Sequence, residues 1–124
     1  MGVVREYRCP SCEKTWKLWI GHGMKHGMLG RVMEAFPADI QKKILAGAGR
    51  ELPLFSFNYE ASVCGHCGSV VAVPVLRLIE SGQTYVGRCP ECGGEAEPLE
   101  ESARISCPGC RQAVLQVQDT GHWD

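Results

Sequence analysis

Eight cysteines, arranged as four Cys-x-x-Cys pairs with none left over, constrain this chain of 124 residues more than any other feature. The pairs are Cys9 with Cys12, Cys64 with Cys67, Cys89 with Cys92 and Cys107 with Cys110. A two-residue spacer lets both sulfurs of a pair face one point, and two pairs supply the four thiolates of a tetrahedral zinc site. The spacing therefore predicts two metal sites, each holding one Zn²⁺ through four cysteines.

A disulfide framework is the alternative use of eight thiols, and it is typical of secreted chains. The N-terminal residues, Met-Gly-Val-Val-Arg-Glu-Tyr-Arg-Cys, show no basic segment followed by an apolar one, as a secretory signal would. No stretch approaches the roughly 18 consecutive apolar residues that suggest a membrane span. We therefore expect free thiols that bind metal, and a cytoplasmic location.

Loop lengths bear on which pairs share a metal. Only 14 residues separate Cys92 from Cys107, whereas 51 separate the first two pairs. Closing short loops costs less entropy, which favours a sequential arrangement. The expected ligand sets are Cys9, Cys12, Cys64 and Cys67 for one site and Cys89, Cys92, Cys107 and Cys110 for the other. The alternative arrangement nests residues 68–88 inside one site and leaves the outermost pairs to meet.

The cysteine pairs resemble the knuckles of the zinc-ribbon, or rubredoxin-like, group of small metal-binding proteins. The resemblance is carried by Cys-Pro-Ser-Cys at 9–12, Cys-Gly-His-Cys-Gly at 64–68, Cys-Pro-Glu-Cys-Gly at 89–93 and Cys-Pro-Gly-Cys at 107–110. Gly68 and Gly93 follow the second cysteine, where a positive φ is easiest, whereas Glu13 and Arg111 occupy the equivalent positions of the other two pairs. The resemblance covers about residues 3–20 and 54–121 and implies ribbon folds. Rubredoxins hold iron with the same four-cysteine geometry, so an iron electron carrier is an alternative, because ligand type alone does not separate the two metals.

The fold class expected from these patterns is a small metal-stabilised α+β fold of two tandem four-cysteine zinc ribbons with short antiparallel strands. Residues 1–80 are expected to form a first ribbon with a helical insert at about 21–53, and residues 81–124 a second, compact ribbon. Expected strands cover residues 3–9, 15–20, 54–63, 70–79, 95–99, 103–106 and 113–118. Pro74 should place its strand at an edge or a bulge, Ser81-Gly82 should join the two modules, and the chain should end in a loose tail at Trp123.

The insert is the part that a minimal ribbon does not need. Apolar residues recur at helical spacing from Met28 to Phe36, and Pro37 suits the first turn of a second helix. One interpretation is a helical hairpin that caps a sheet. The other is a docking surface for a partner protein, because methionine-rich faces adapt to what they bind. The candidate docking residues are Met28, Leu29, Val32, Met33, Phe36, Ile40 and Ile44.

Two smaller motifs have alternative interpretations. His22, Met24, His26 and Met28 alternate in a glycine-rich loop and offer soft ligands for Cu(I), although a flexible hinge explains the same residues. The Cys64-Gly-His-Cys67 segment has the same four residues as the active site of protein disulfide isomerases. There the first cysteine begins a helix, whereas here a strand is expected after the pair, so we expect no redox catalysis.

The function expected from the sequence is that of a non-enzymatic adaptor or regulatory protein acting through protein–protein contacts. No catalytic set is recognisable, and a metal held by four thiolates has no open position for water or substrate. The alternative is nucleic-acid association through a basic and aromatic surface made of Lys14, Lys17, Lys25, Arg31, Lys42, Lys43 and Arg50 with Trp16 and Trp19. Charge opposes that alternative, because the chain carries a formal net charge of −1 and residues 81–124 carry 7 Asp+Glu against 3 Lys+Arg.

Overall fold

The computed structural model describes residues 2–23, 28–48, 54–100 and 104–123, which form seven strands and two short helices. The strands are β1 (Gly2–Arg8), β2 (Thr15–Ile20), β3 (Phe55–Cys64), β4 (Val70–Leu78), β5 (Thr84–Val86), β6 (Ala96–Pro98) and β7 (Gln116–Trp123). The helices are α1 (Leu29–Met33) and α2 (Ala38–Ala48). This small, mostly antiparallel architecture with few helices is consistent with a metal-stabilised α+β fold.

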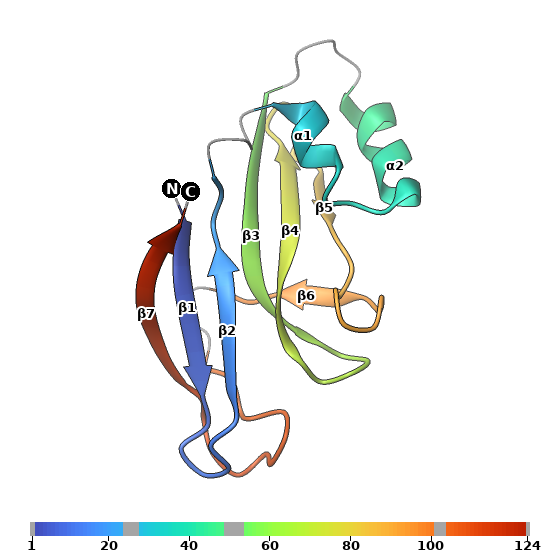
Figure 1. Cartoon of the computed structure of the whole chain (residues 1–124). Coiled ribbons are helices and arrows are strands. Elements are labelled where there is room, and N and C mark those ends of the chain that lie inside the picture. Colours follow the sequence, from blue (N-terminus) through green and yellow to red (C-terminus); the bar gives the residue numbers. More distant parts are fainter. Residues whose placement is uncertain (1, 24–27, 49–53, 101–103, 124) are drawn as a thin grey trace.

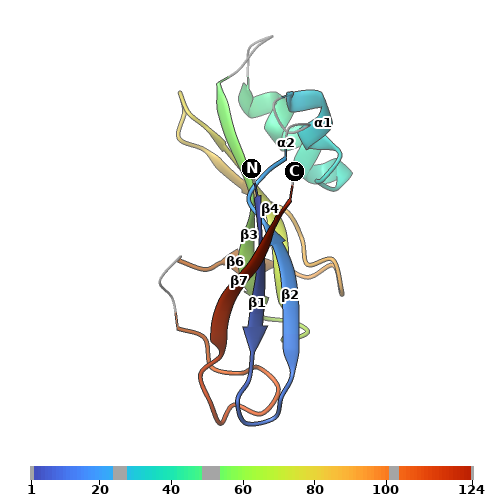
Figure 2. The ribbon, with the colours of Figure 1, turned by 60° about the vertical axis from the view of Figure 1, so that its left-hand side comes forward.

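The strands form two antiparallel sheets, shown side by side in Figure 1; in Figure 2 the sheet of β7, β1 and β2 lies in front of the other. One sheet has the strand order β2-β1-β7 and the other the order β5-β4-β3-β6. A bridge joins them just after β2, where Gly21 N–H donates to the Tyr59 carbonyl at 2.8 Å and Tyr59 N–H donates to the Gly21 carbonyl at 2.7 Å. The two sheets are therefore hydrogen-bonded to each other at this point.

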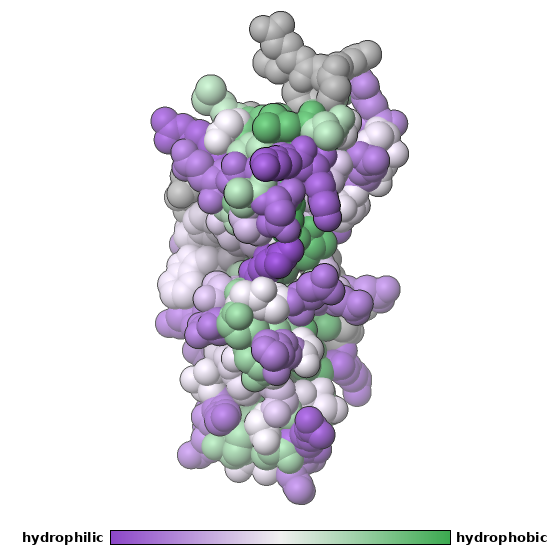
Figure 3. Space-filling model, turned by 90° about the vertical axis from the view of Figure 1, so that its right-hand side faces the viewer, coloured by the Kyte–Doolittle hydropathy of each residue, from purple (hydrophilic) through white to green (hydrophobic). Residues whose placement is uncertain are grey.

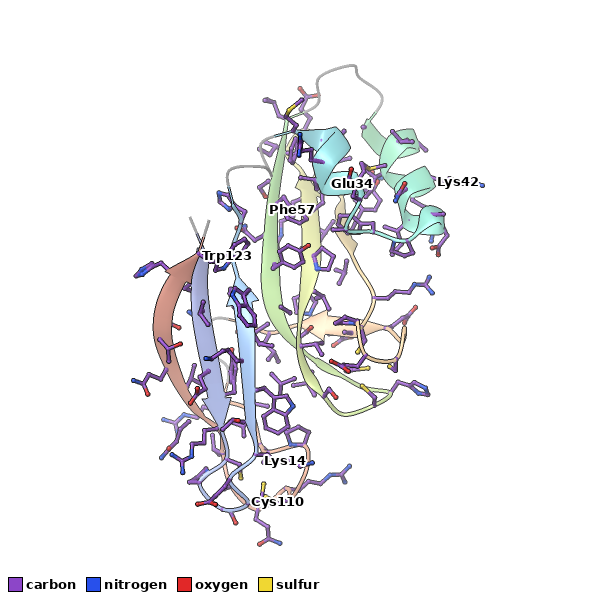
Figure 4. The ribbon with its side chains drawn as sticks, in the orientation of Figure 1. Lys14, Glu34, Lys42, Phe57, Cys110 and Trp123 are labelled. Carbon is purple, nitrogen blue, oxygen red and sulfur yellow. The ribbon has the colours of Figure 1, made fainter. Side chains whose placement is uncertain are left out.

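One face of the four-stranded sheet is covered in two halves. Alternate residues of a strand point to the same face, and Phe57 of β3 lies opposite Leu76 of β4, as Ala61 lies opposite Ala72. The half around Phe57 packs against α1 and α2, and Figure 4 shows the Phe57 side chain between β3 and the helices. The half around Ala61 packs against the β2-β1-β7 sheet. Each half forms a separate hydrophobic cluster.

The insert forms the helical hairpin that the apolar spacing predicts, and its apolar side chains face the sheet. Five of the seven candidate docking residues are buried in the cluster with Phe57 and Leu76: Val32, Met33, Phe36, Ile40 and Ile44. Leu29 is half-buried against the same cluster and only Met28 is exposed. Because these side chains complete a core, the expectation that they form a docking surface is wrong.

Outward from this core, the insert is largely polar. Figure 3, which looks onto the side that carries α2, shows hydrophilic side chains with scattered hydrophobic ones between them. Leu45 is the exposed large hydrophobic residue of α2. A scattered apolar residue on a polar face is ordinary for a protein surface.

Strand pairing crosses the expected module boundary at residue 80. Strand β7 runs along β1 from Gly2 opposite Trp123 to Arg8 opposite Gln116, so the two ends of the chain lie together (Figure 1). Ser81-Gly82 lies in the turn that connects β4 to β5, closed by the Leu78 N–H bond to the Gln83 carbonyl. Strand β6 pairs with β3 and not with residues 103–106, of which 104–106 are described.

Trp123 is anchored, in contrast to the loose tail expected from the sequence. Its indole Nε1 donates to the Ile20 carbonyl at 3.0 Å, and its ring meets the Tyr59 ring edge-on with centroids 6.5 Å apart. The side chain covers Gly2, where a Cβ atom would come within van der Waals overlap of the indole. Pairing of β7 with β1 thus places this terminal residue over both sheets.

Pro74 lies inside a continuous strand, opposite Tyr59. Strand β5 pairs with β4 only from Val75 to Arg77. On the side of β4 away from β3, no residue of β5 therefore lies opposite the Pro74 nitrogen. Its carbonyl accepts from Gly87 N–H at 2.8 Å, just beyond the end of β5. The missing N–H group therefore falls where the strand is locally an edge, which is the position a proline tolerates.

Candidate metal centres

All four cysteine pairs adopt the same turn. The N–H group of each first cysteine donates to a carbonyl five or six residues later, as Cys9 does to Lys14 at 2.9 Å. The residue after each second cysteine donates back to the carbonyl of the first, as Gly93 does to Cys89 at 2.8 Å. Further backbone N–H groups point at sulfur, among them those of Cys12 toward Cys9 Sγ and Cys67 toward Cys64 Sγ, both at 3.4 Å. Such turns present sulfur outward and stabilise negative charge on it.

The residue after the second cysteine has a positive φ in every pair. Gly68 and Gly93 have φ of 75° and 76°, and Glu13 and Arg111, which lack the expected glycine, have 64° and 57°. The left-handed conformation is therefore imposed by the turn and not by the residue type. Non-glycine residues adopt it at a cost of about 1–2 kcal/mol.

Replacing Glu13 by glycine is accordingly expected to stabilise the metal-loaded protein by up to about 1 kcal/mol, since glycine removes the steric cost but adds entropy to the unfolded chain. Gly93→Ala should have the opposite sign at about 1 kcal/mol, because open space surrounds Gly93 and only the backbone resists. Urea unfolding at fixed zinc concentration measures both. Gly65→Ala, in open space without a positive φ, is the matched control and should be close to neutral. Equal effects of the two alanine variants would contradict the strain argument.

The eight sulfurs gather into two tetrads. In the outer tetrad, Cys9 Sγ lies 3.5 Å from Cys110 Sγ and Cys12 Sγ lies 3.7 Å from Cys107 Sγ. In the inner tetrad, the four members are Cys64, Cys67, Cys89 and Cys92, with distances of 3.5 Å for Cys64 to Cys92 and 3.7 Å for Cys67 to Cys89. All sulfurs of a tetrad lie within 4.8 Å of one another.

These distances fit a shared metal ion. Tetrahedral zinc with bonds of about 2.3 Å places its sulfurs about 3.8 Å apart, close to the spacing in both tetrads. A disulfide would need about 2.05 Å, and all eight cysteines are free thiols. The structure therefore contains two groups of four cysteines positioned to hold metal ions, as in a zinc-ribbon-like metal-binding protein.

The grouping is nested, so the expected sequential pairing is wrong. The outermost pairs, Cys9/Cys12 and Cys107/Cys110, form one tetrad, and the two middle pairs form the other. Nesting lengthens each closing loop by less than a factor of two, and each doubling costs only about 0.6 kcal/mol. The β3–β4 ladder, which runs from Phe55 to Val63, and the pairing of β6 with β3 beside Cys64 outweigh that small entropic preference.

Hydrogen bonds give thiols within a tetrad different pKa values. In the inner tetrad, hydrogen bonds from the side chain and the backbone N–H of Ser69 lower the pKa of Cys67 to about 6. The Gly94 N–H acts in the same direction on Cys92, but burial and the other three thiols outweigh it and raise its pKa to about 12. In the outer tetrad, the backbone N–H groups of Cys110 and Gly109 lower the pKa of Cys107 to about 6. A bound divalent metal would deprotonate the remaining thiols, so metal binding releases protons.

Metal stoichiometry of serine variants tests the nesting directly. Replacing the first and fourth pairs together is expected to leave one metal per chain, because the inner tetrad remains complete. Replacing the first and second pairs together should leave none, because each tetrad loses two ligands. Native mass spectrometry counts the metal in each variant: Cys9→Ser, Cys12→Ser, Cys107→Ser and Cys110→Ser against Cys9→Ser, Cys12→Ser, Cys64→Ser and Cys67→Ser. One metal in the second variant and none in the first would restore the sequential pairing.

The other motifs singled out in the sequence are placed as follows. Cys64 ends a strand and lies in the inner tetrad, without the helix that activates the first cysteine of a disulfide isomerase. His22 Nδ1 is 2.8 Å from Asn58 Oδ1 at the surface. Met24 and His26 lie outside the described residues, so the copper interpretation of that loop stays a prediction.

A groove that the sequence indicated only in part runs along β2. It encloses about 610 Å³ and is lined by all three tryptophans of the chain, Trp16, Trp19 and Trp123, together with Lys17 and residues 70–72 of β4. A smaller hollow beside it is lined by Lys14 and by the fourth cysteine turn. Lys25 and Arg50 of the expected basic surface lie outside the described residues. Arg31, Lys42 and Lys43 do not line this groove.

Trp123 is the residue of this candidate site that sequence reasoning missed. The aromatic and basic character of Trp16, Trp19 and Lys17 is visible in their own short segment. Trp123 is 104 positions from Trp19, and it joins them only because β7 pairs with β1 next to β2. Figure 4 shows its side chain at the upper end of that three-stranded sheet, directed toward β3.

Comparison with known proteins returns no match: no family model, no curated protein and no solved structure is significantly similar to the chain. Within the described ranges, neither α1 nor α2 is long and apolar enough to cross a membrane.

Proposed function

We propose that this protein is a non-enzymatic adaptor in which two zinc ions, each held by four cysteines, fix the two sheets that flank a binding groove. The observation that carries the proposal is that each tetrad supplies four sulfurs within 4.8 Å. A zinc ion with four protein thiolates has no open coordination position, which is the property of structural and not of catalytic sites.

The position of the tetrads supports a structural role. Cys9 and Cys107 are buried in the cluster between the sheets, and Cys64 and Cys89 are buried in a cluster on the opposite face of the four-stranded sheet. Metal bound there would lie at the turns that end β1 and β3. In a chain with so few large apolar side chains, metal binding is an effective source of folding free energy.

Eight reduced thiols are also compatible with the reducing cytoplasm, where we place the protein. Zinc is favoured over iron because each tetrad has two cysteines buried in a separate hydrophobic cluster, where a bound metal would stabilise the fold. An iron electron carrier would instead need its metal to be tuned and reached for electron transfer.

Native mass spectrometry with elemental analysis, on protein purified without added metal, tests the metal assignment. We expect two zinc ions per chain and no visible absorption. One or two irons, with thiolate-to-iron charge-transfer bands, would overturn the adaptor proposal and identify an electron carrier.

The adaptor role itself is tested by cross-linking mass spectrometry of the zinc-loaded protein at its natural abundance, followed by reconstitution with the purified partner. Titration calorimetry should then give a defined stoichiometry, and Trp19→Ala in the groove should weaken binding, while Leu45→Ala on the outer face of α2 serves as the control. Binding lost in Leu45→Ala but not in Trp19→Ala would move the interface to the insert. Absence of any protein that binds the purified chain would remove the adaptor role.

A further inference from the structure

The groove along β2 has the features of a site for an extended peptide, an inference that rests on the proposed adaptor function and names the partner's chemistry. Its walls include two runs of consecutive residues, 15–19 of β2 and 70–72 of β4. When one face of a strand borders a cavity, alternate residues line it; when the edge of a strand borders it, consecutive residues do. Tyr59 and Trp123 close one end, and Pro90 and Glu91 of the third cysteine turn lie on the far wall.

Within the described residues, the edge of β2 that borders the groove carries no ladder from Thr15 to Ile20, and the bridge of Gly21 to Tyr59 follows directly after it. Strand β2 is the end strand of its sheet, and its ladder is with β1. The Cys9 N–H bond to the Lys14 carbonyl marks the first hydrogen-bonded pair of the β1–β2 hairpin. Because such pairs alternate in an antiparallel ladder, the backbone N–H and C=O groups of Thr15, Lys17 and Trp19 turn away from β1 and toward the groove.

Side chains on either side of this free edge define what a pairing strand would meet. Leu18 is buried and Trp16 is half-buried, and both belong to the cluster with Val70 and Ala72. A peptide strand beside β2 would place alternate side chains over the same apolar seam. Trp19 faces the other way and is 51 % exposed, which leaves a large aromatic surface for a partner to cover.

The charged side chains near the groove indicate which residue type suits the peptide positions between the aliphatic ones. Lys17 lies on the exposed face of β2, and Lys14 lies just before the first residue of the strand, near Gly109. Neither lysine forms an ion pair within the part of the chain that the structure describes, whereas Arg8 beside them pairs with Glu13 at 3.9 Å. An acidic side chain opposite Lys17 would complement this end of the groove.

We propose that β2 receives an extended peptide segment of a partner protein, which adds as a fourth strand to the β2-β1-β7 sheet. The segment carries aliphatic side chains at alternate positions, facing Val70 and Ala72, and an acidic residue between them opposite Lys17. Strand β2 has six residues, so the paired segment spans about 20 Å. Main-chain hydrogen bonds supply affinity and the alternate pockets supply specificity.

Single-stranded nucleic acid also stacks on aromatic side chains beside lysines, but the charge of the whole molecule opposes it. Two zinc ions with four thiolates each bring the formal net charge from −1 to about −5. A second copy of this chain could pair β2 with β2 about a two-fold axis and close as a dimer. Centred on Lys17, such a pair would place two lysines opposite each other, which is destabilising.

The proposal is tested by selecting linear twelve-residue peptides from a random display library on the zinc-loaded full chain. We expect enrichment of segments in which aliphatic residues alternate and Asp or Glu occupies an intervening position. The best peptide is then synthesised with a fluorescent label, and its affinity is measured by anisotropy at two salt concentrations. Enrichment of sequences without alternation, or of helical amphipathic ones, would overturn the proposal.

Three variants of β2 and one control variant of α2 separate backbone pairing from side-chain contact. Lys17→Pro removes one outward N–H group while leaving the β1–β2 ladder intact, as prolines do at a free edge, and should weaken peptide binding at least tenfold. Lys17→Gln keeps that N–H group and should weaken it by a few-fold through lost charge. Trp19→Ala, at an exposed position, should weaken it tenfold, and Lys42→Gln on α2 should leave it unchanged. Retained metal stoichiometry and near-ultraviolet circular dichroism show that each variant is folded.

The outcomes distinguish this proposal from the adaptor function. Peptides that bind wild type, Lys17→Pro and Trp19→Ala equally would place the peptide elsewhere, which overturns the β2 site and leaves the adaptor role standing. Salt-sensitive binding of a labelled dT₂₀ or U₂₀ oligonucleotide, without peptide enrichment, would assign the groove to nucleic acid. Light scattering that shows dimers or fibres abolished by Lys17→Pro would assign it to a second copy. Two bound irons would remove the adaptor function independently of the peptide result.

Discussion

Removal of both metal ions is expected to unfold the chain as a whole. Structural zinc sites contribute on the order of 10 kcal/mol each in peptide systems, and a domain of this size is stable by only about 5–15 kcal/mol in total. The loss cannot be confined to the turns, because Cys9 and Cys107 are fully buried in one hydrophobic cluster and Cys64 and Cys89 are buried in another.

The measurement is near-ultraviolet circular dichroism with a thermal scan, on protein treated with a high-affinity zinc chelator under reducing conditions. We expect loss of the tertiary signal and of the cooperative transition, with both restored by zinc. Chelator already saturated with zinc is the control for direct effects of the reagent. A native signal and a cooperative melt after complete metal removal would show that hydrophobic packing suffices.

Loss of the outer tetrad and loss of the inner tetrad should release different parts of the fold. The outer tetrad joins the β1–β2 turn to the segment before β7, so its loss is expected to release the three-stranded sheet and Trp123 first. The inner tetrad lies at the end of the β3–β4 hairpin, whose upper half also packs on the helices. Tryptophan fluorescence therefore reports mainly the outer site.

The cysteines positioned to hold metal could be identified from the sequence because the information is local. A two-residue spacer within each pair specifies its turn, and the structure shows that even Glu13 and Arg111 take the left-handed conformation that these turns require. The same holds for α2, where Ile40 and Ile44 recur at helical spacing after Pro37. The structure brings all eight cysteines into tetrads.

The sequence does not show in the same way which distant segments pair with these local features. Which tetrad Cys89 joins depends on β6 pairing with β3, and three residues of β6 carry no pattern that specifies a neighbour. Loop entropy, the only sequence-level criterion, differs by less than the contribution of a few ladder contacts. The anchoring of Trp123 likewise depends on contacts between the two ends of the chain.

The apolar face of the insert shows how one pattern serves two interpretations. Helical spacing of Val32, Phe36 and Ile40 predicts a face that must be covered, but it does not say whether the cover is a partner or the chain's own sheet. Phe57 and Leu76, which supply the cover, lie 17 residues or more beyond Ile40 and alternate as strand residues do. The structure joins the two patterns, with the Phe36 and Phe57 rings edge-on at 6.2 Å.

The second large effect is therefore expected at Ile44, where truncation to alanine should destabilise the metal-loaded protein by about 2–5 kcal/mol. Ile44 is fully buried in the cluster with Phe57 and Leu76, so the lost methyl groups leave a cavity in a rigid core. Urea unfolding at fixed free zinc measures the change, because bound metal otherwise shifts the apparent stability. Leu45→Ala is the matched control one position along α2: its side chain is exposed, and the change should stay within about 0.5 kcal/mol. If Ile44→Ala left stability unchanged and instead abolished partner binding, the insert would be a docking surface. The proposal that the groove along β2 binds the partner would then be wrong.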